Sequence, residues 1–145
     1  MKELIHFIEE EKLALIKFRG LVDMSTVDSR GRVIISEFEK SGYQKCIIDL
    51  RDTSFQFEYQ HVSQIYDSFK KLYAATLYVN WVFITNSPKS TILVLLFIKN
   101  VEETKSNAIQ CSTLDYAIQF LNAKSSTDKI KSILEELSYS LVPSL

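Results

Sequence analysis

Residues 45–55 read KCIIDLRDTSF and indicate the fold class more clearly than any other stretch of the chain. The first half, Lys45–Leu50, is a short and almost continuous apolar run, which is typical of a strand covered on both faces of a parallel sheet. The second half, Arg51–Ser54, is polar and is expected to form a loop where the strand ends. Ligands of open α/β sheets bind outside such carboxyl ends. The stretch therefore predicts both a parallel sheet and the place of a functional site.

A β-hairpin and a helix are expected ahead of this stretch. Leu4–Ile8 and Leu13–Phe18 are two apolar runs separated by an acidic turn, and Gly20 is expected to end the second strand. A helix is expected over Thr26–Lys40, and Gly42 is well placed to stop it. The apolar side of this helix follows from residues that recur at helical spacing: Val27, Gly31, Ile34, Ile35 and Phe38.

Helices and strands alternate after the stretch. The expected elements are, in order, a helix over Glu58–Ala75, a strand over Leu77–Thr85, a helix over Thr91–Ile98, a strand over Ala108–Cys111 and two helices that begin near Ser112 and Ser125. Thr91–Ile98 would also suit a strand, but Pro88 at a first helical position favours the helix. A hairpin followed by this alternation predicts an α/β fold with a mixed, mostly parallel sheet and crossover helices.

The chain is expected to contain one α/β domain over residues 1–123 and a helical extension over residues 124–145. A chain of 145 residues can form one sizeable core, whereas two domains would each have a thin one. The extension carries an apolar stripe that must be buried: Ile130, Ile133, Leu134 and Leu137. The stripe could pack across the domain or against a second copy of the chain, and we expect a homodimer.

Composition excludes several classes of function. The 17 basic and 18 acidic residues are interspersed and give a net charge of −1, so no basic stripe is available for a nucleic acid backbone. The most apolar region, Leu77–Ile98, is interrupted by polar residues and is too broken to span a membrane. The charged N-terminus does not resemble a signal peptide. We therefore expect a cytoplasmic protein that does not bind nucleic acid.

Few side chains in the sequence suggest catalysis or metal binding. Cys46 and Cys111 lie in apolar segments, which predicts buried, reduced thiols of low reactivity. His6 and His61 have no metal ligands at helical spacing, and the three glycines are too far apart for a phosphate-binding loop. We expect neither a cofactor nor a metal site.

The order of elements and two local stretches resemble the STAS family and the related STAS/SEC14-like group of small bacterial proteins. Ile48–Phe55 is similar to the strand and loop ahead of the family's signature helix, and Ile109–Leu121 is similar to its last strand and the following helix. The resemblance covers about Ile5–Leu121. It implies the same α/β fold and a role in binding other proteins. The SEC14-like part of the resemblance implies a cavity for a lipid or a similar molecule.

The chain departs from the family at the position of a phosphorylated serine. In STAS proteins that antagonise anti-sigma factors, an Asp-Ser-Ser/Ala-Gly sequence opens the signature helix, and phosphorylation of its first serine switches partner binding. The corresponding residues here are Phe57-Glu58-Tyr59-Gln60, so Glu58 stands in place of the acceptor. Glu58 is either a permanent charge at the partner-binding edge or an acid that favours a helix start, and the sequence favours the second interpretation. Thr53 and Ser54 are nearby hydroxyls that either accept phosphate or cap the turn.

The candidate partner-binding residues surround the end of the strand and the expected loop: Asp49, Arg51, Asp52, Thr53, Ser54, Phe55, Phe57, Glu58 and Tyr59. The charged members either form a polar binding edge or pair locally to hold the turn, and the sequence favours pairing. The aromatic members exceed what a solvated turn needs, so they are expected to line a pocket or an interface.

Two functions remain open from the sequence. The first is a non-catalytic regulatory or protein-interaction module that lacks the phosphoacceptor serine. The alternative is a carrier of an apolar small molecule or lipid in an internal cavity. An enzyme would need a polar cleft with a reactive group of perturbed pKa.

Overall fold

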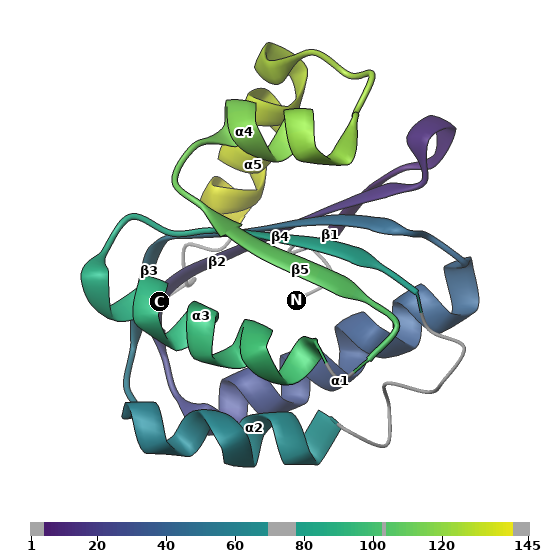
Figure 1. The fold of residues 1–145 in the computed structure, drawn as a ribbon. Coiled ribbons are helices and arrows are strands. Elements are labelled where there is room, and N and C mark those ends of the chain that lie inside the picture. The colour runs from purple at the N-terminus through teal and green to yellow at the C-terminus, as the bar shows by residue number, and fades with distance from the viewer. Residues whose placement is uncertain (1–4, 70–77, 103, 141–145) are drawn as a thin grey trace.

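The computed structural model describes residues 5–69, 78–102 and 104–140. Over these residues the chain forms one mixed sheet with the strand order β1-β2-β3-β4-β5 (Figure 1). The strands are β1 Ile5–Ile8, β2 Leu13–Val22, β3 Lys45–Phe55, β4 Asn80–Ile84 and β5 Asn107–Cys111. β1 and β2 pair antiparallel as a hairpin, and the other neighbours pair parallel. The predicted α/β class, with an opening hairpin and a mostly parallel sheet, is confirmed.

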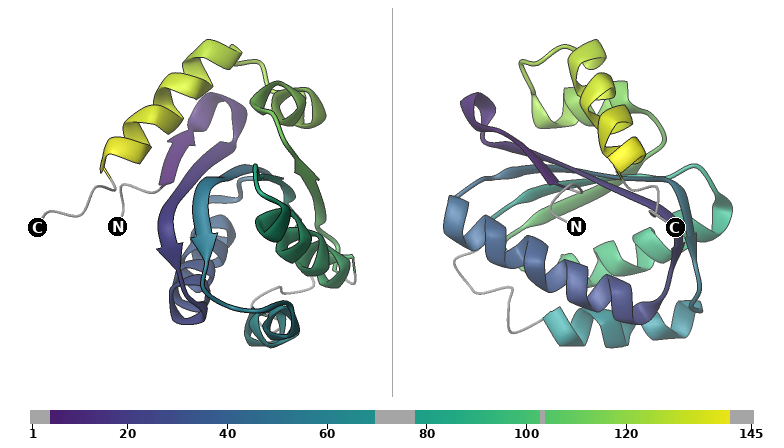
Figure 2. Two further views of the ribbon diagram at one scale, coloured as in Figure 1. Left: turned by 90° about the vertical axis from the view of Figure 1, so that its left-hand side faces the viewer. Right: turned by 180° about the vertical axis from the view of Figure 1, so that it is seen from behind.

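Helices cover both faces of the sheet (Figure 2). The helices on one face are α1 Met24–Ser41, α2 Val62–Phe69 and α3 Pro88–Val101, and those on the other face are α4 Leu114–Leu121 and α5 Thr127–Ser140. Among the described residues, two 3-10 helices accompany them: η2 Glu9–Glu11 in the hairpin turn and η3 Tyr59–His61 directly ahead of α2. The parallel strands are joined by the crossover helices α1, α2 and α3, as the sequence predicts.

Alternate residues of β3 enter two hydrophobic cores, one beneath each layer of helices. Ile47 packs on the side of α4 and α5. Cys46, Ile48 and Leu50 pack on the side of α1, α2 and α3. This burial on both faces explains the almost continuous apolar run of the strand.

β2 and β3 are both longer than predicted. Gly20 has a left-handed backbone conformation with φ of 82° inside β2, and the strand continues beyond it to Val22. β3 continues past Asp49 because its later residues pair with Arg19–Val22 of β2. The expected loop over Arg51–Ser54 is therefore wrong: these residues belong to a strand.

The helices lie where the sequence predicts them, with shifted starts. Pro88 opens α3, which contains all of the Thr91–Ile98 segment, so the helical alternative is confirmed. Gly42 ends α1 with φ of 70°, and its N–H donates to the carbonyl of Phe38. The helix expected from Glu58 begins as η3 and continues as α2 from Val62. Its expected end, and the expected start of the next strand, fall within residues 70–77, outside the described residues.

α5 packs across the sheet of its own chain. Its apolar stripe is buried in the core beneath α4 and α5: Ile130, Leu134 and Leu137, with Ile133 packed beside them. The carboxylate of Glu11 in η2 accepts hydrogen bonds from the backbone N–H groups of Lys124 and Ser125, just ahead of α5. Of the two uses expected for the stripe, packing across the domain is the one observed. The homodimer expected through this helix stays a prediction.

Candidate partner-binding edge

β2 and β3 continue as a pair beyond the rest of the sheet. β4 pairs with β3 only as far as Asp49, whereas Arg19–Val22 of β2 still pair with Asp52–Phe55 of β3. We call these two segments the β2–β3 ribbon. In Figure 1 the ribbon bends away from the sheet, down the left-hand side toward α2. Most of the predicted partner-binding residues thus lie on or directly beside a two-stranded ribbon.

An irregularity in strand pairing marks the base of the ribbon. Lys17 pairs with Asp49 and Arg19 pairs with Asp52, so β3 advances three residues while β2 advances two. Such a bulge bends the strand and increases its twist. Gly20 follows with a positive φ that glycine adopts at little cost. Together these features explain why the ribbon leaves the plane of the sheet.

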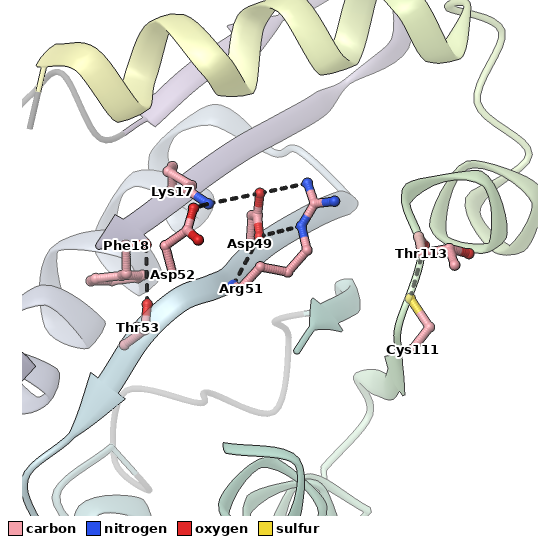
Figure 3. A network of polar contacts seen from close by, with 8 residues as sticks. All are labelled: Lys17, Phe18, Asp49, Arg51, Asp52, Thr53, Cys111 and Thr113. Atoms are coloured by element: carbon pink, nitrogen blue, oxygen red, sulfur yellow. Dashed lines mark hydrogen bonds and ion pairs between the residues drawn. The ribbon is translucent and has the colours of Figure 1, made fainter. Parts of the chain in front are cut away.

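A buried ion network fixes the base of the ribbon (Figure 3). The Nζ atom of Lys17 lies 3.1 Å from Oδ2 of Asp49 and 3.1 Å from Oδ2 of Asp52, although the lysine side chain is only 3% exposed. Asp49 is 1% exposed and also accepts hydrogen bonds from Nε of Arg51 at 3.0 Å and Nη2 of Arg51 at 2.9 Å. The local pairing that the sequence favours is present, with Lys17 as a further member.

The charges in this network stabilise one another. Burial alone would raise the pKa of Asp49, but hydrogen bonds from Arg51 and the charge of Lys17 outweigh it, and the pKa is lowered. The hydrogen bond to Asp49 raises the pKa of Arg51. A buried pair of charges contributes little net stability, but the loss of one partner leaves an uncompensated charge and is costly. Any other pairing of β2 with β3 at the base of the ribbon would leave one of these charges buried without its partner. The network therefore favours the observed register.

The two faces of the ribbon have different surroundings. The hydroxyl of Thr53 is directed inward and donates to the carbonyl of Phe18 at 3.0 Å, and Thr53 is 7% exposed. This hydrogen bond agrees with the interpretation of Thr53 as a hydroxyl that holds the backbone locally. Leu21 and Ser54 pair across the ribbon, and both are exposed, Leu21 to 70%. Asp52 is also exposed, to 62%. The outer face thus combines an apolar side chain with polar neighbours.

Glu58 stands at a helix start. Its backbone N–H donates to Nδ1 of His61 at 3.2 Å, and the two residues form a capping box around η3. Its carboxylate lies 3.7 Å from Nζ of Lys89, with both side chains exposed. This geometry supports the helix-start interpretation of Glu58. Tyr59, the first residue of η3, is 42% exposed beside it.

Phe55 and Phe57 face the interior. Their ring centroids lie 5.3 Å apart, and Phe57 is 7% exposed. Both line an apolar cavity of about 130 Å³ between the sheet, the ribbon and the helices α1, α2 and α3. The cavity is lined by apolar side chains and glycine, with Trp81 of β4 and Gly31 of α1 among them. The predicted site residues therefore divide into an exposed group on the ribbon and an aromatic pair on a cavity wall.

Sequence reasoning missed two residues of this region. Lys17 stands two positions after the buried Leu15, on the same face of β2, and a lysine at an inward strand position requires a buried partner. The alternation of inward and outward positions along β2 therefore indicates that Lys17 is buried. Leu21 gave no such signal, because a leucine in an apolar strand is ordinarily assigned to the core.

Both thiols are buried and free. Burial raises the pKa of Cys46 well above its usual range. Burial also raises the pKa of Cys111, whose Sγ lies 3.4 Å from the carbonyl of Thr113 (Figure 3). Thiols in such surroundings are poor nucleophiles, as the sequence predicts.

The described part of the chain shows neither a cluster of metal-ligand side chains nor a membrane-spanning helix. Within residues 5–69, 78–102 and 104–140, no group of three or more His, Cys, Asp or Glu side chains is placed to hold a metal ion. No helix in the described part of the chain is both long enough and apolar enough to cross a membrane. A shallow hollow at the carboxyl ends of β4 and β5 is lined by hydroxyl, amide and apolar side chains, Thr85, Asn86 and Ser112 among them.

Comparison with known proteins gave one structural likeness. No protein-family pattern matches the sequence, and no curated protein sequence matches it. The chain is similar to the solved structure of the anti-sigma factor antagonist SpoIIAA in its unphosphorylated form, with 17% sequence identity and a TM-score of 0.47. The likeness covers 82% of this chain and 96% of that one.

Proposed function

We propose that this chain is a non-catalytic protein-interaction module that binds its partner through the outer face of the β2–β3 ribbon and the start of η3. The observation that carries the proposal is the exposure of Leu21, at 70%, and Tyr59, at 42%, beside the polar side chains of Asp52 and Ser54. Protein interfaces combine apolar or aromatic anchors with a polar rim in this way. We call this surface, made of Leu21, Asp52, Ser54 and Tyr59, the ribbon edge.

The support beneath the ribbon edge favours binding without rearrangement. Lys17 holds one end of the ribbon through ion pairs with the buried Asp49 and the exposed Asp52. Thr53 holds its middle, through its hydroxyl to Phe18 and through its carbonyl, which accepts a hydrogen bond from the Ser90 hydroxyl at 3.5 Å. A surface that is ordered before binding loses less conformational entropy on association. The ribbon edge thus has the preorganisation that a docking surface needs.

Partner binding in this proposal needs no phosphate switch. Glu58 caps η3 in place of the acceptor serine that the family resemblance implies, and Thr53 is buried. Ser54 is an exposed hydroxyl, and here it contributes to the polar rim rather than receiving phosphate. The module would therefore bind constitutively in the cytoplasm.

Affinity capture from the source cell tests this function. The purified chain with Leu21→Ser should bind its partner at least about fivefold more weakly, since truncating an interface anchor costs more than ~1 kcal/mol. Leu95→Ser is the matched control, because Leu95 is 49% exposed and belongs to α3 rather than to the ribbon. Equal loss with both variants, or no loss with Leu21→Ser, would reject the ribbon edge as the binding surface.

The cavity favours a second candidate function, carriage of an apolar small molecule. Its volume of about 130 Å³ and its apolar lining are the observation that supports this alternative. Solvent extraction of the protein purified from its own cell, followed by mass spectrometry, tests it. A carrier should yield one apolar compound in near-stoichiometric amount, and only trace amounts of many compounds would reject it.

A further inference from the structure

The cavity has a size and a composition that select a narrow class of molecule. Ligand pockets for drug-sized molecules run from ~300 to ~1,000 Å³, and this cavity of about 130 Å³ is well below that range. An apolar cavity of ~150 Å³ stays free of water and can bind benzene. The volume of the cavity therefore suits one ring.

The walls of the cavity define the chemistry that would fit. Phe18 comes from β2 just ahead of the ribbon, and Phe55 comes from the ribbon. The other walls include Val27 of α1, Phe83 of β4 and Phe97 of α3. No carboxylate, amine, amide or hydroxyl side chain is among the described residues that line it. A charged or strongly hydrogen-bonding ligand would lose its water shell without compensation, at a cost of several kcal/mol by the general rule for buried polar groups. Aromatic walls also favour edge-to-face contact with a ring.

We propose that this cavity is a binding site for a single-ring, uncharged apolar molecule of benzene or toluene size. The inference rests on the second candidate function and names its ligand class. It names a single ring in place of the lipid that the SEC14-like resemblance implies.

Trp81 supplies a direct probe of occupancy. It is the single tryptophan of the chain, it lines the cavity, and it is only 2% exposed. Iodobenzene brings a heavy atom into contact with the indole when it enters the cavity, and should quench the fluorescence of Trp81. Iodide carries a similar heavy atom but is charged, so it should stay in water and leave the buried indole unquenched.

Two valines of α1 give a matched pair of variants. Val27 lines the cavity, whereas Val33 on the same helix is 46% exposed. Val27→Phe should fill the cavity with a ring of its own, and Val33→Phe makes the same change in solvent. Gly31 also lines the cavity, so Gly31→Leu is a second way to fill it should Val27→Phe fail to fold. Circular dichroism verifies that each variant is folded before titration.

The experiment titrates the full chain with iodobenzene and follows the fluorescence of Trp81. We expect saturable quenching that benzene reverses by competition, unchanged in Val33→Phe and reduced at least about tenfold in affinity in Val27→Phe or Gly31→Leu. Quenching that never saturates and is equal in all variants would overturn the site. Saturable displacement by oleate but not by benzene would overturn the ligand class while leaving the carrier function intact. Absence of any quenching, together with a solvent extract free of apolar compounds, would reject both the binding site in the cavity and the carrier function.

Discussion

Asp49 is the residue on which the ion network depends, because it pairs with both Lys17 and Arg51 while being 1% exposed. Asp49→Asn leaves these cations without their shared carboxylate and should lower the free energy of unfolding by about 3 kcal/mol. Asp52→Asn is the matched control, because Asp52 contacts the same lysine but is 62% exposed. We expect it to cost less than about 1 kcal/mol. Urea unfolding of both variants measures the difference, and equal losses would contradict the central place of Asp49.

The lowered pKa of Asp49 predicts a specific loss of stability in acid. Its pKa in the folded chain lies below its ordinary value of 3.8, so the unfolded chain binds the proton more readily between the two values. The stabilising contribution is present above pH ~4 and is lost as the pH falls through the folded pKa. Urea midpoints measured from about pH 5 to about pH 2 should fall more steeply for the wild type than for Asp49→Asn. Parallel curves would show that Asp49 is not the titrating group.

Glu58 is expected to matter for stability and not for partner binding. Glu58→Ser and Glu58→Gln both remove the charge near Lys89 and should lower the free energy of unfolding by less than about 1 kcal/mol, since the pair is exposed and serine can also cap a helix. Thermal unfolding and affinity capture are measured side by side for the three proteins. If both variants lost their partner while remaining folded, Glu58 would be a permanent binding charge and the capping interpretation would be insufficient.

At the scale of elements, local sequence patterns predict the identity of the helices and strands better than their ends. Pro88 correctly predicted that α3 is a helix, and Gly42 correctly predicted the end of α1. Both predictions succeed because these residues restrict or free the backbone dihedral angles at their own positions. The end of β3 could not be predicted in this way, because Asp52–Phe55 are strand residues only through pairing with Arg19–Val22 of β2. Polar residues there indicate exposure, and exposure alone does not separate a loop from the outer face of a ribbon.

The candidate site was predicted in part for the same reason. The sequence predicted that Asp49, Arg51 and Asp52 lie close together, because they are near neighbours along β3. The prediction did not include Lys17, because its contacts with Asp49 and Asp52 arise from the parallel pairing of β2 with β3. The sequence predicted that Phe55 and Phe57 line a pocket or an interface, and both residues line the cavity.

α5 is expected to be an integral part of the hydrophobic core beneath α4 and α5. Ile130→Ala removes a side chain that is 0% exposed and should lower the free energy of unfolding by about 2–5 kcal/mol. Ile133→Ala makes the same change on the same helix, where the side chain is only half-buried, and should cost about half as much or less. Chemical unfolding compares the two. Equal and small effects would mean that α5 is only loosely attached to the sheet.

At the scale of the whole molecule, the β2–β3 ribbon stands between two surfaces with different candidate roles. Its inner face, with Val22 and Phe55, is part of the cavity wall, and its outer face, with Leu21 and Ser54, belongs to the ribbon edge. The ribbon is fixed to the sheet at one end by the ion network. A partner on the outer face and a ring on the inner face would therefore act on the same two strands.

The central claim, that the ribbon edge binds a partner protein, is tested most directly by site-specific photocrosslinking in the source cell. A photoreactive benzoyl-phenylalanine replaces Tyr59 at the ribbon edge or, as the matched control, Tyr116, which is 53% exposed near the start of α4. Both replacements exchange one exposed aromatic ring for another close to a helix start. We expect irradiation to give one discrete adduct of higher mass from position 59 and none from position 116. The same adduct from both positions, or an adduct from position 116 alone, would contradict the claim.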